Sequence, residues 1–256
     1  MRDETSRSRF EQRKVGAVYE MNRTELTGSG AHMNELIVYS GPLSMFGAKV
    51  QIAALEKGLE FRLIMVPFDS QRGYNPRHAE VLRINPKRQV PVLVHGALEI
   101  FDSTQIFEYL EDLQPEPPLW PREPAARARA RGLELQSDEV YFPHIIRLMS
   151  LQDALSSEPA VSAIEAAGRF CVDMDRRLAT REWLAGSFTF ADIAFYMAAL
   201  FGERQSAPLT AATPHLLAWR ERMTRRAPVR TVVSAMARWL KDAGRPVPAF
   251  MAETMA

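Results

Sequence analysis

The chain has 256 residues, of which 46% are hydrophobic and 25% charged, and its formal net charge at pH 7 is +1. This composition is typical of a soluble globular protein, and the length suits one large domain or two small ones. The near-neutral charge argues against a nucleic-acid partner, and the lack of a run of about 18 apolar residues argues against a transmembrane helix.

Residues 1–33 are polar, mixed in charge and without sustained periodicity, which predicts a disordered extension. The letters GSGAHM also resemble a cloning remnant, with Met33 as the alternative natural start, and a short amphipathic helix is a further alternative. No charged start followed by an apolar core is present, so no secretory signal is expected. The single cysteine, Cys171, cannot form an internal disulfide, which fits a cytoplasmic protein.

Residues 34–114 have the pattern of an α/β domain. LIVY predicts a buried strand, AKVQIAALEKG predicts a helix that ends at Gly58, and EFRLIMVPF predicts a second strand. A short helix is expected over residues 78–84, and the runs PVLV and LEIF predict a β-hairpin. The expected order is therefore βαβ, short helix, ββα, with a right-handed βαβ crossover.

Two short motifs flank this hairpin. Val90 stands before Pro91, and an X-Pro bond is the kind of peptide bond that can be cis at modest cost. Asp102 and Ser103 stand at the head of the apolar-periodic segment TQIFEYLEDL, and we expect Ser103 to cap that helix. The spare N–H groups and partial positive charge at this helix start suit a carboxylate.

Residues 115–124 (PEPPLWPREP) predict a proline-rich linker between two domains. Residues 125–242 are helical in pattern and predict an all-α second domain, and residues 243–256 are expected to form a loose tail. The first helix of this domain is expected to run from residue 125 to about 155, with a bend at Pro143.

The order and spacing of these features resemble the cytosolic glutathione transferases. The resemblance rests on Gln-Val-Pro at 89–91, on Asp-Ser at 102–103, and on the capping box Thr-x-x-Asp at 189–192, and it covers about residues 34–242. It implies a thioredoxin-like N-terminal domain followed by an all-α C-terminal domain. The motifs are most similar to the serine-type, bacterial-looking members of the theta, phi, tau and zeta classes.

The resemblance also implies a site for glutathione as co-substrate. Val90, ahead of cis-Pro91, would pair through its backbone with the cysteinyl part of glutathione, and Gln89 would assist as an amide donor. Asp102 would receive the γ-glutamyl ammonium, while Ser103 would donate to the γ-glutamyl carboxylate.

A cation is needed for the glycine carboxylate of glutathione. Arg77 is nearest to the family position for this cation, with Arg72, His78 and Lys87 as neighbours. Which of them holds the carboxylate stays open.

A glutathione transferase lowers the thiol pKa of bound glutathione, because the thiolate is the nucleophile. A hydroxyl that donates to the sulfur has this effect, and Tyr39, Ser40 and Ser44 compete for the role. In the serine-type classes the catalytic serine lies six residues before a helix valine, and Ser44 stands six before Val50. Ser44 is therefore the predicted catalytic residue and Ser40 the alternative, whereas Tyr39 is expected to pack in the first strand.

The resemblance places the second substrate between the domains, against the first long helix of the second domain. The candidate residues there are Tyr141, Phe142, His144 and Arg147, within DEVYFPHIIRLM. No metal-ligand spacing, phosphate-binding glycine loop or Ser-His-Asp signature is evident, so no metal is expected.

The predicted activity is attack of glutathione thiolate on a small hydrophobic electrophile, typical of detoxification, by a homodimeric cytoplasmic enzyme. Two alternatives stay open. The same site would serve a glutathione-dependent peroxide or disulfide reductase, a dehalogenase, an ether-cleaving lyase or an isomerase. A non-catalytic binding or regulatory protein is favoured by Ala48 and Lys49, which replace the usual helix arginine.

Overall fold

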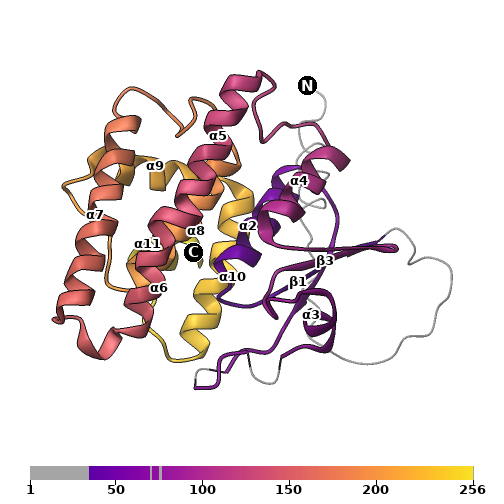
Figure 1. Cartoon of the computed structure of the whole chain (residues 1–256), viewed down its shortest axis with the longest axis horizontal. Coiled ribbons are helices and arrows are strands. Elements are labelled where there is room, and N and C mark those ends of the chain that lie inside the picture. Colours follow the sequence, from indigo (N-terminus) through magenta and orange to yellow (C-terminus); the bar gives the residue numbers. More distant parts are fainter. Residues whose placement is uncertain (1–34, 70, 75–76, 256) are drawn as a thin grey trace, which may run out of the picture.

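The computed structural model describes residues 35–69, 71–74 and 77–255, and the prediction for residues 1–33 lies outside them (Figure 1). An α/β layer occupies one side of the molecule in Figure 1 and a larger group of helices the other. Within the described residues, no helix is both long and apolar enough to cross a membrane.

The sheet has four strands in the order β2-β1-β3-β4, with β1 parallel to β2 and antiparallel to β3, and β3 antiparallel to β4. The strands are β1 (Leu36–Ser40), β2 (Arg62–Met65), β3 (Val92–His95) and β4 (Leu98–Phe101). The helices of this half are α2 (Met45–Glu56), α3 (Ala79–Ile84) and α4 (Ser103–Leu113). The predicted order βαβ, short helix, ββα is confirmed.

The two faces of the sheet are covered by different helices because successive strand residues point to opposite faces. Val38 and Leu93 are buried in one cluster with apolar residues of α2 and α4. Their strand neighbours Tyr39 and Val92 are buried in another cluster with Val81 of α3.

The second half is helical, as predicted. Its helices are α5 (Pro124–Gln136), α6 (Phe142–Ser150), α7 (Glu158–Leu178), α8 (Phe190–Arg204), α9 (Pro214–Arg225), α10 (Ala227–Asp242) and α11 (Ala249–Ala252). Shorter turns are the π-helical η1 (Ser137–Tyr141) and the 3₁₀ turns η2 (Gln152–Ala154) and η3 (Glu253–Met255).

The long helix predicted from residue 125 to about 155 is divided by the π-helical turn η1, which ends just ahead of Pro143. Proline lacks an N–H, and its ring crowds the carbonyl four residues earlier, so the preceding turn widens instead of continuing as regular helix.

The prediction of a loose tail over residues 243–256 is wrong for residues 249–255, whereas residues 243–248 contain no helix or strand. α11 and η3 fold back on α10, with Met251 fully buried and Phe250 nearly so. Burial of these two apolar side chains stabilises the segment.

The predicted capping box is present at the start of α8. Asp192 accepts a hydrogen bond from the Thr189 N–H at 3.0 Å. The same carboxylate accepts from the N–H of Leu184 and from Nε1 of Trp219, at 3.0 and 2.9 Å. This buried carboxylate therefore ties three segments of the helical half together.

One continuous core joins the two halves. α2 packs against α8 and α10, and the ring of Phe107 in α4 stacks on Phe190 of α8 with centroids 3.8 Å apart. The loop between β1 and α2 therefore lies where the sheet meets the helical half, which is the setting for the candidate site.

Candidate functional site

Ser44 is the N-cap residue of α2. Its hydroxyl oxygen accepts a hydrogen bond from the backbone N–H of Gly47 at 3.0 Å, and the residue is half-buried. A hydroxyl that accepts such a bond still has its own O–H to donate. The cap therefore fixes the position of Ser44 and leaves its donor available for a bound anion.

Ser40 and Tyr39 occupy the interior. Ser40 is fully buried and its oxygen accepts from Nε2 of Gln51 at 2.9 Å. Tyr39 packs between the sheet and α3, with its ring centroid 5.1 Å from that of His78, and burial raises the pKa of its hydroxyl. Of the three competing hydroxyls, Ser44 is the one that combines a helix N-terminus with partial exposure.

The Val90–Pro91 peptide bond is cis, as the resemblance implies. Val90 is half-buried and precedes β3, whose pairing with both neighbouring strands begins at Val92. Its backbone therefore lies beyond the end of the ladder, where an extended ligand can pair with it.

Asp102, rather than Ser103, is the N-cap of α4, so the prediction that Ser103 caps this helix is wrong. The carboxylate of Asp102 accepts from the N–H groups of Thr104 and Gln105 at 3.1 and 3.4 Å. Asp102 has a φ of +76°, which turns the chain so sharply that helical geometry already begins at Ser103. Ser103 is buried at this first helical position, beside the capping carboxylate.

The basic residues near this helix start are exposed. Nζ of Lys87 lies 3.6 Å from Oδ2 of Asp102. Arg77 is exposed on the segment that leads into α3, and Gln89 is exposed while its carbonyl accepts from Nδ2 of Asn85 at 2.6 Å. Lys87, one of the neighbours of Arg77 considered for the glycine carboxylate, thus lies beside the Asp-Ser pair.

Phe142 is the member of the predicted second-substrate pocket that contacts α2. Its ring meets Phe46, two residues beyond Ser44, with centroids 5.3 Å apart and an edge-on angle of 85°. Phe201 of α8 also contacts Phe142, with ring centroids 5.7 Å apart. These three rings form an aromatic wall near the N-terminus of α2.

Two other predicted pocket residues have surroundings different from those of Phe142, and Arg147 is exposed on α6. Tyr141 is fully buried in the helical core, edge-on to Phe195. His144 is half-buried, and its pKa is lowered by burial and by the charges of Arg147 and of Arg169 on α7. Successive helix residues project about 100° apart, so neighbours in sequence face different surroundings.

Tyr74 adjoins the loop before Ser44, Arg204 lies near Tyr74, and neither residue belongs to a motif that the sequence displays. A Cβ on Gly41 would overlap the Tyr74 hydroxyl, and burial raises the pKa of that hydroxyl to about 12. Burial, with the charge of Arg245, lowers the pKa of Arg204 to about 10, and its guanidinium lies 5.0 Å from the Phe201 ring centroid. Residues this far apart in the sequence carry no local signal of their proximity.

Lys49 of α2 links the α/β half to the helical half. Its fully buried Nζ lies 3.0 Å from Oε1 of Glu134 and 2.5 Å from Oδ2 of Asp138. Thr104 donates a further hydrogen bond to Glu134 at 2.7 Å. Lys49 therefore has a structural role at the domain boundary in the place where the resembled motif is altered.

Among the described residues, no group of three or more histidine, cysteine, aspartate or glutamate side chains is arranged to hold a metal ion. Cys171 is buried in α7, and burial raises the pKa of its thiol to about 12. A thiol in this state is a poor nucleophile.

Comparison with known families gives matches in both halves. The family model described as glutathione S-transferase, N-terminal domain, matches residues 38–118. The family model described as glutathione S-transferase, C-terminal domain, matches residues 163–227.

The curated relatives include proteins named as glutathione S-transferases and proteins named for a starvation response. The chain is 39% identical over 123 residues to glutathione S-transferase 1 of Dianthus caryophyllus, covering 48% of this chain and 52% of that one. It is 33% identical over 107 residues to a stringent starvation protein A homolog of Coxiella burnetii, covering 42% and 48%. The chain thus spans about half the length of these curated relatives.

A solved structure shares the fold over most of the chain. It is a glutathione transferase from Pseudomonas putida with one glutathione disulfide bound per subunit, at a TM-score of 0.70 and 20% identity. The alignment covers 80% of this chain and 93% of that one.

Proposed function

The chain belongs to the glutathione S-transferase family, and from this premise we propose that it is a glutathione transferase in which Ser44 stabilises the glutathione thiolate. The thiolate would attack the electrophilic carbon of a small hydrophobic substrate and form a C–S bond. The electron pair of the broken bond leaves with the departing group, or stays on the substrate in an addition. The thiol proton is released to solvent.

The position of Ser44 carries this proposal. Its oxygen is occupied by the Gly47 N–H, so its O–H is the group left to donate to a sulfur anion. The N-terminus of α2 adds a partial positive charge at the same place. Both effects favour the charged form of the thiol and so lower its pKa.

The peptide backbone of glutathione would lie beside Val90, just before the point at which β3 begins to pair with β1 and β4. Val90 would pair with the cysteinyl part, and Asp102 and Ser103 would hold the γ-glutamyl end at the start of α4. Gln89 remains the proposed amide donor. Arg77 remains the proposed partner of the glycine carboxylate.

The electrophile would bind against the aromatic wall of Phe46, Phe142 and Phe201, which begins two residues from Ser44. Aromatic faces of this kind suit a small apolar substrate. We also propose that the protein is a homodimer, as the family resemblance implies.

The test separates the two roles of Ser44. We expect Ser44→Gly to lower turnover on the order of 100-fold, because the oxyanion-type donor is lost. The pH at which enzyme-bound glutathione ionises should rise, as followed by the ultraviolet absorbance of the thiolate. Glycine retains much of the capping ability that alanine lacks, so Ser44→Gly should unfold close to wild type while Ser44→Ala loses about 1 kcal/mol.

Ser40→Ala is the matched control, since Ser40 faces Gln51 in the interior. Unchanged turnover and an unchanged thiol pKa in Ser44→Gly would contradict the assignment. If Ser40→Ala, rather than Ser44→Gly, lowered turnover and raised the pKa of the bound thiol, the catalytic role would belong to Ser40.

A regulatory function without catalysis is the second candidate, favoured by the relative named stringent starvation protein A homolog and by Lys49 in the altered helix motif. Calorimetric titration with glutathione and with S-hexylglutathione distinguishes the two. Binding of both, with the alkylated form tighter, supports a transferase with an apolar second pocket. Binding of neither at millimolar concentration supports the regulatory function.

Reductase, dehalogenase, lyase or isomerase chemistry would use the same glutathione site. A panel of peroxide, disulfide and halogenated substrates separates these from conjugation.

A further inference from the structure

We propose that Arg204 and Tyr74 bind an anionic group of the second substrate, so that the preferred electrophile is an aromatic molecule that carries a carboxylate. This inference rests on the proposed function, because it names the substrate class of the same site. Arg204 is the last residue of α8, and Tyr74 lies in the loop between β2 and α3. Neither residue takes part in the proposed contacts with glutathione.

Arg204 adjoins the aromatic wall of Phe46, Phe142 and Phe201. Its guanidinium carbon lies 5.0 Å from the ring centroid of Phe201. Phe201 contacts Phe142, and Phe142 contacts Phe46, with ring centroids 5.7 and 5.3 Å apart. The guanidinium therefore places a positive charge beside the rings against which the electrophile would bind.

Tyr74 approaches the same region from the α/β half. Its hydroxyl packs so closely on Gly41 that a Cβ there would overlap it. The carbonyl of Gly41 accepts a hydrogen bond from the N–H of Ser44 at 3.0 Å, so Tyr74 lies against the turn that leads to Ser44. Phe68 supports the Tyr74 ring edge-on, with centroids 4.8 Å apart. The charge of Arg204 reaches the Tyr74 hydroxyl and lowers its pKa, against the larger effect of burial.

The polar atoms of this pair lack acceptors. Nη1 of Arg204 is buried and has no hydrogen-bond partner among the residues that the structure describes. The buried hydroxyl of Tyr74 likewise makes no hydrogen bond of good geometry there, although the backbone of Leu43 is close enough to lower its pKa. Native proteins rarely leave a buried charged donor unsatisfied, because the cost is high. A bound anion would accept from both groups.

The described residues provide no carboxylate that neutralises Arg204. The groups whose charges act on its pKa are Arg245 and Tyr74. The adjacent Glu203 is paired with Arg220 instead, at 2.6 Å. Burial and the charge of Arg245 lower the pKa of Arg204 to about 10, so the guanidinium is still protonated at pH 7. The positive charge is therefore available to a ligand.

These neighbours indicate the class of electrophile. The aromatic wall suits a flat apolar body, and a guanidinium suits the two oxygens of a carboxylate. We therefore expect an aryl or arylalkyl compound whose carboxylate lies away from the carbon that the thiolate attacks. The carboxylate is unchanged by the reaction and serves to position the substrate.

Calorimetric titration of the full chain with two glutathione conjugates tests the proposal. The conjugates are S-(4-carboxybenzyl)glutathione and its neutral isostere S-(4-carbamoylbenzyl)glutathione. We expect the carboxylate form to bind about tenfold more tightly, because it gains a charge-assisted hydrogen bond. Added salt should reduce this preference.

Two variants assign the preference to the pair. Arg204→Gln should weaken the carboxylate conjugate about tenfold and leave the affinities for the carbamoyl conjugate and for glutathione unchanged. Tyr74→Phe keeps the ring against Phe68 but loses the hydroxyl, so it should reduce the preference about threefold. Thermal unfolding checks that both variants are folded.

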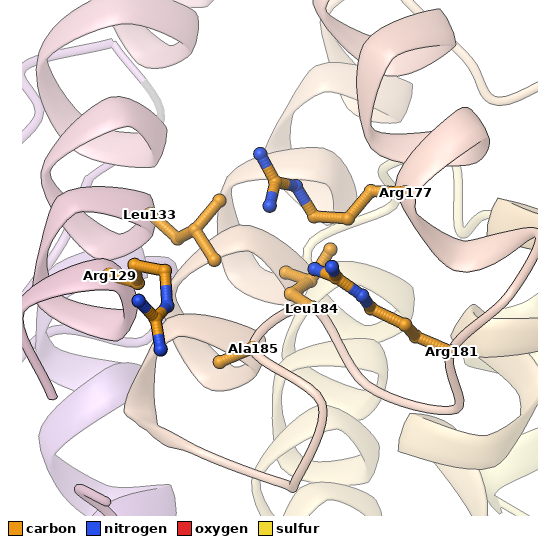
Figure 2. Close-up of a pocket in the computed structure, with 6 residues that line it drawn as sticks. All are labelled: Arg129, Leu133, Arg177, Arg181, Leu184 and Ala185. Carbon is orange, nitrogen blue, oxygen red and sulfur yellow. The ribbon is translucent and has the colours of Figure 1, made fainter. Parts of the chain in front are cut away.

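Arg177→Gln is the matched control. Nε of Arg177 is also buried without a hydrogen-bond partner among the described residues. Arg177 belongs, however, with Arg129 and Arg181 to a pocket of about 330 Å³ between α5 and the C-terminal end of α7 (Figure 2). Among the described residues, none that lines this pocket belongs to the aromatic wall. Arg177→Gln should therefore keep the full preference for the carboxylate conjugate.

Turnover separates this inference from the proposed function. Glutathione thiolate substitutes 4-chloro-3,5-dinitrobenzoate and the corresponding benzamide in the same way: a C–S bond forms, and chloride leaves with the electron pair of the C–Cl bond. Arg204→Gln should lower kcat/KM about tenfold for the benzoate and leave the benzamide unchanged. If the wild type converted neither compound but still preferred the carboxylate conjugate, the transferase function would be wrong and the anion site would be supported.

Three outcomes would overturn the inference. The first is equal affinity of the wild type for the two conjugates, or no binding of either at millimolar concentration, which would also contradict the proposed function. The second is an equal loss for both conjugates, or a loss for glutathione itself, in a folded Arg204→Gln. The third is loss of the preference in Arg177→Gln instead of Arg204→Gln, which would place the carboxylate in the other pocket.

Discussion

At the scale of single residues, the buried ammonium of Lys49 faces two carboxylates, Glu134 and Asp138. One positive charge cannot neutralise both. Burial raises the pKa of Asp138 to about 6, with the negative charge of Glu134 adding to the effect and the positive charge of Lys49 opposing it. Asp138 therefore keeps its proton to a higher pH than an aspartate in water does.

This arrangement predicts a pH dependence of stability. An aspartate in an unfolded chain has a pKa of about 3.9, so between about pH 4 and pH 6 the folded protein holds a proton that the unfolded chain has released. The contribution of Asp138 is complete below that range and is lost as the pH rises through about 6. Through Asp138, the unfolding free energy of the wild type should therefore fall by about 3 kcal/mol across this pH range, and Asp138→Asn should abolish that part of the fall. Urea denaturation at several pH values measures both.

Glu139→Gln, a change at the exposed neighbouring residue, is the control and should keep the wild-type pH profile. The buried Asp192, whose pKa burial also raises to about 6, is present in every variant, so the difference isolates Asp138. Parallel profiles for wild type and Asp138→Asn would refute the prediction.

At the scale of elements, two helical glycines differ in what surrounds them. A Cβ on Gly202 of α8 would overlap the buried hydroxyl of Tyr141, whereas a Cβ on Gly168 of α7 meets open space. Gly202 thus permits η1 and α8 to approach closely. Gly168 has no such role, and it carries the usual cost of glycine inside a helix.

Alanine substitutions at the two positions should therefore have opposite effects. Gly202→Ala should lower the free energy of unfolding by about 1 to 3 kcal/mol, because Tyr141 must move within a packed core. Gly168→Ala should raise it by about 0.5 to 1 kcal/mol. Chemical denaturation measures both, and equal effects at the two sites would contradict this account.

At the scale of the whole molecule, Arg226 clamps the helical half to the α/β half. Its guanidinium donates to both carboxylate oxygens of Glu56 at 2.6 and 2.7 Å, and it lies 3.6 Å from the ring centroid of Phe188. Glu56 ends α2, the helix that Ser44 begins. The clamp therefore helps to hold α2 against the helical half.

Arg226→Lys should destabilise the protein by about 1 to 2 kcal/mol, because lysine can neither bind both oxygens nor stack on the ring. Arg225→Lys is the control: its pair with Glu221 is exposed, and such pairs contribute little. Urea denaturation of the two variants gives the comparison, and a loss of similar size at position 225 would show that the clamp has no special role.

Features that depend on short stretches of chain were predictable. The strand and helix order, the cis bond at Pro91 and the capping box of Thr189 and Asp192 follow from periodicity and family motifs within a few residues of each other. The predicted cap of α4 at Ser103 was wrong by one residue, because Asp102, with a φ of +76°, is the N-cap.

The sequence by itself determined the family, the two-domain order and the short motifs that surround Ser44, since local propensity and spacing specify them. Only the tertiary structure decided that Lys49 is paired across the domain boundary, that Tyr141 is core, and that Arg129 and Arg177 share a pocket. Such contacts join residues dozens of positions apart. Their partners are chosen by packing of whole elements, which no local pattern encodes.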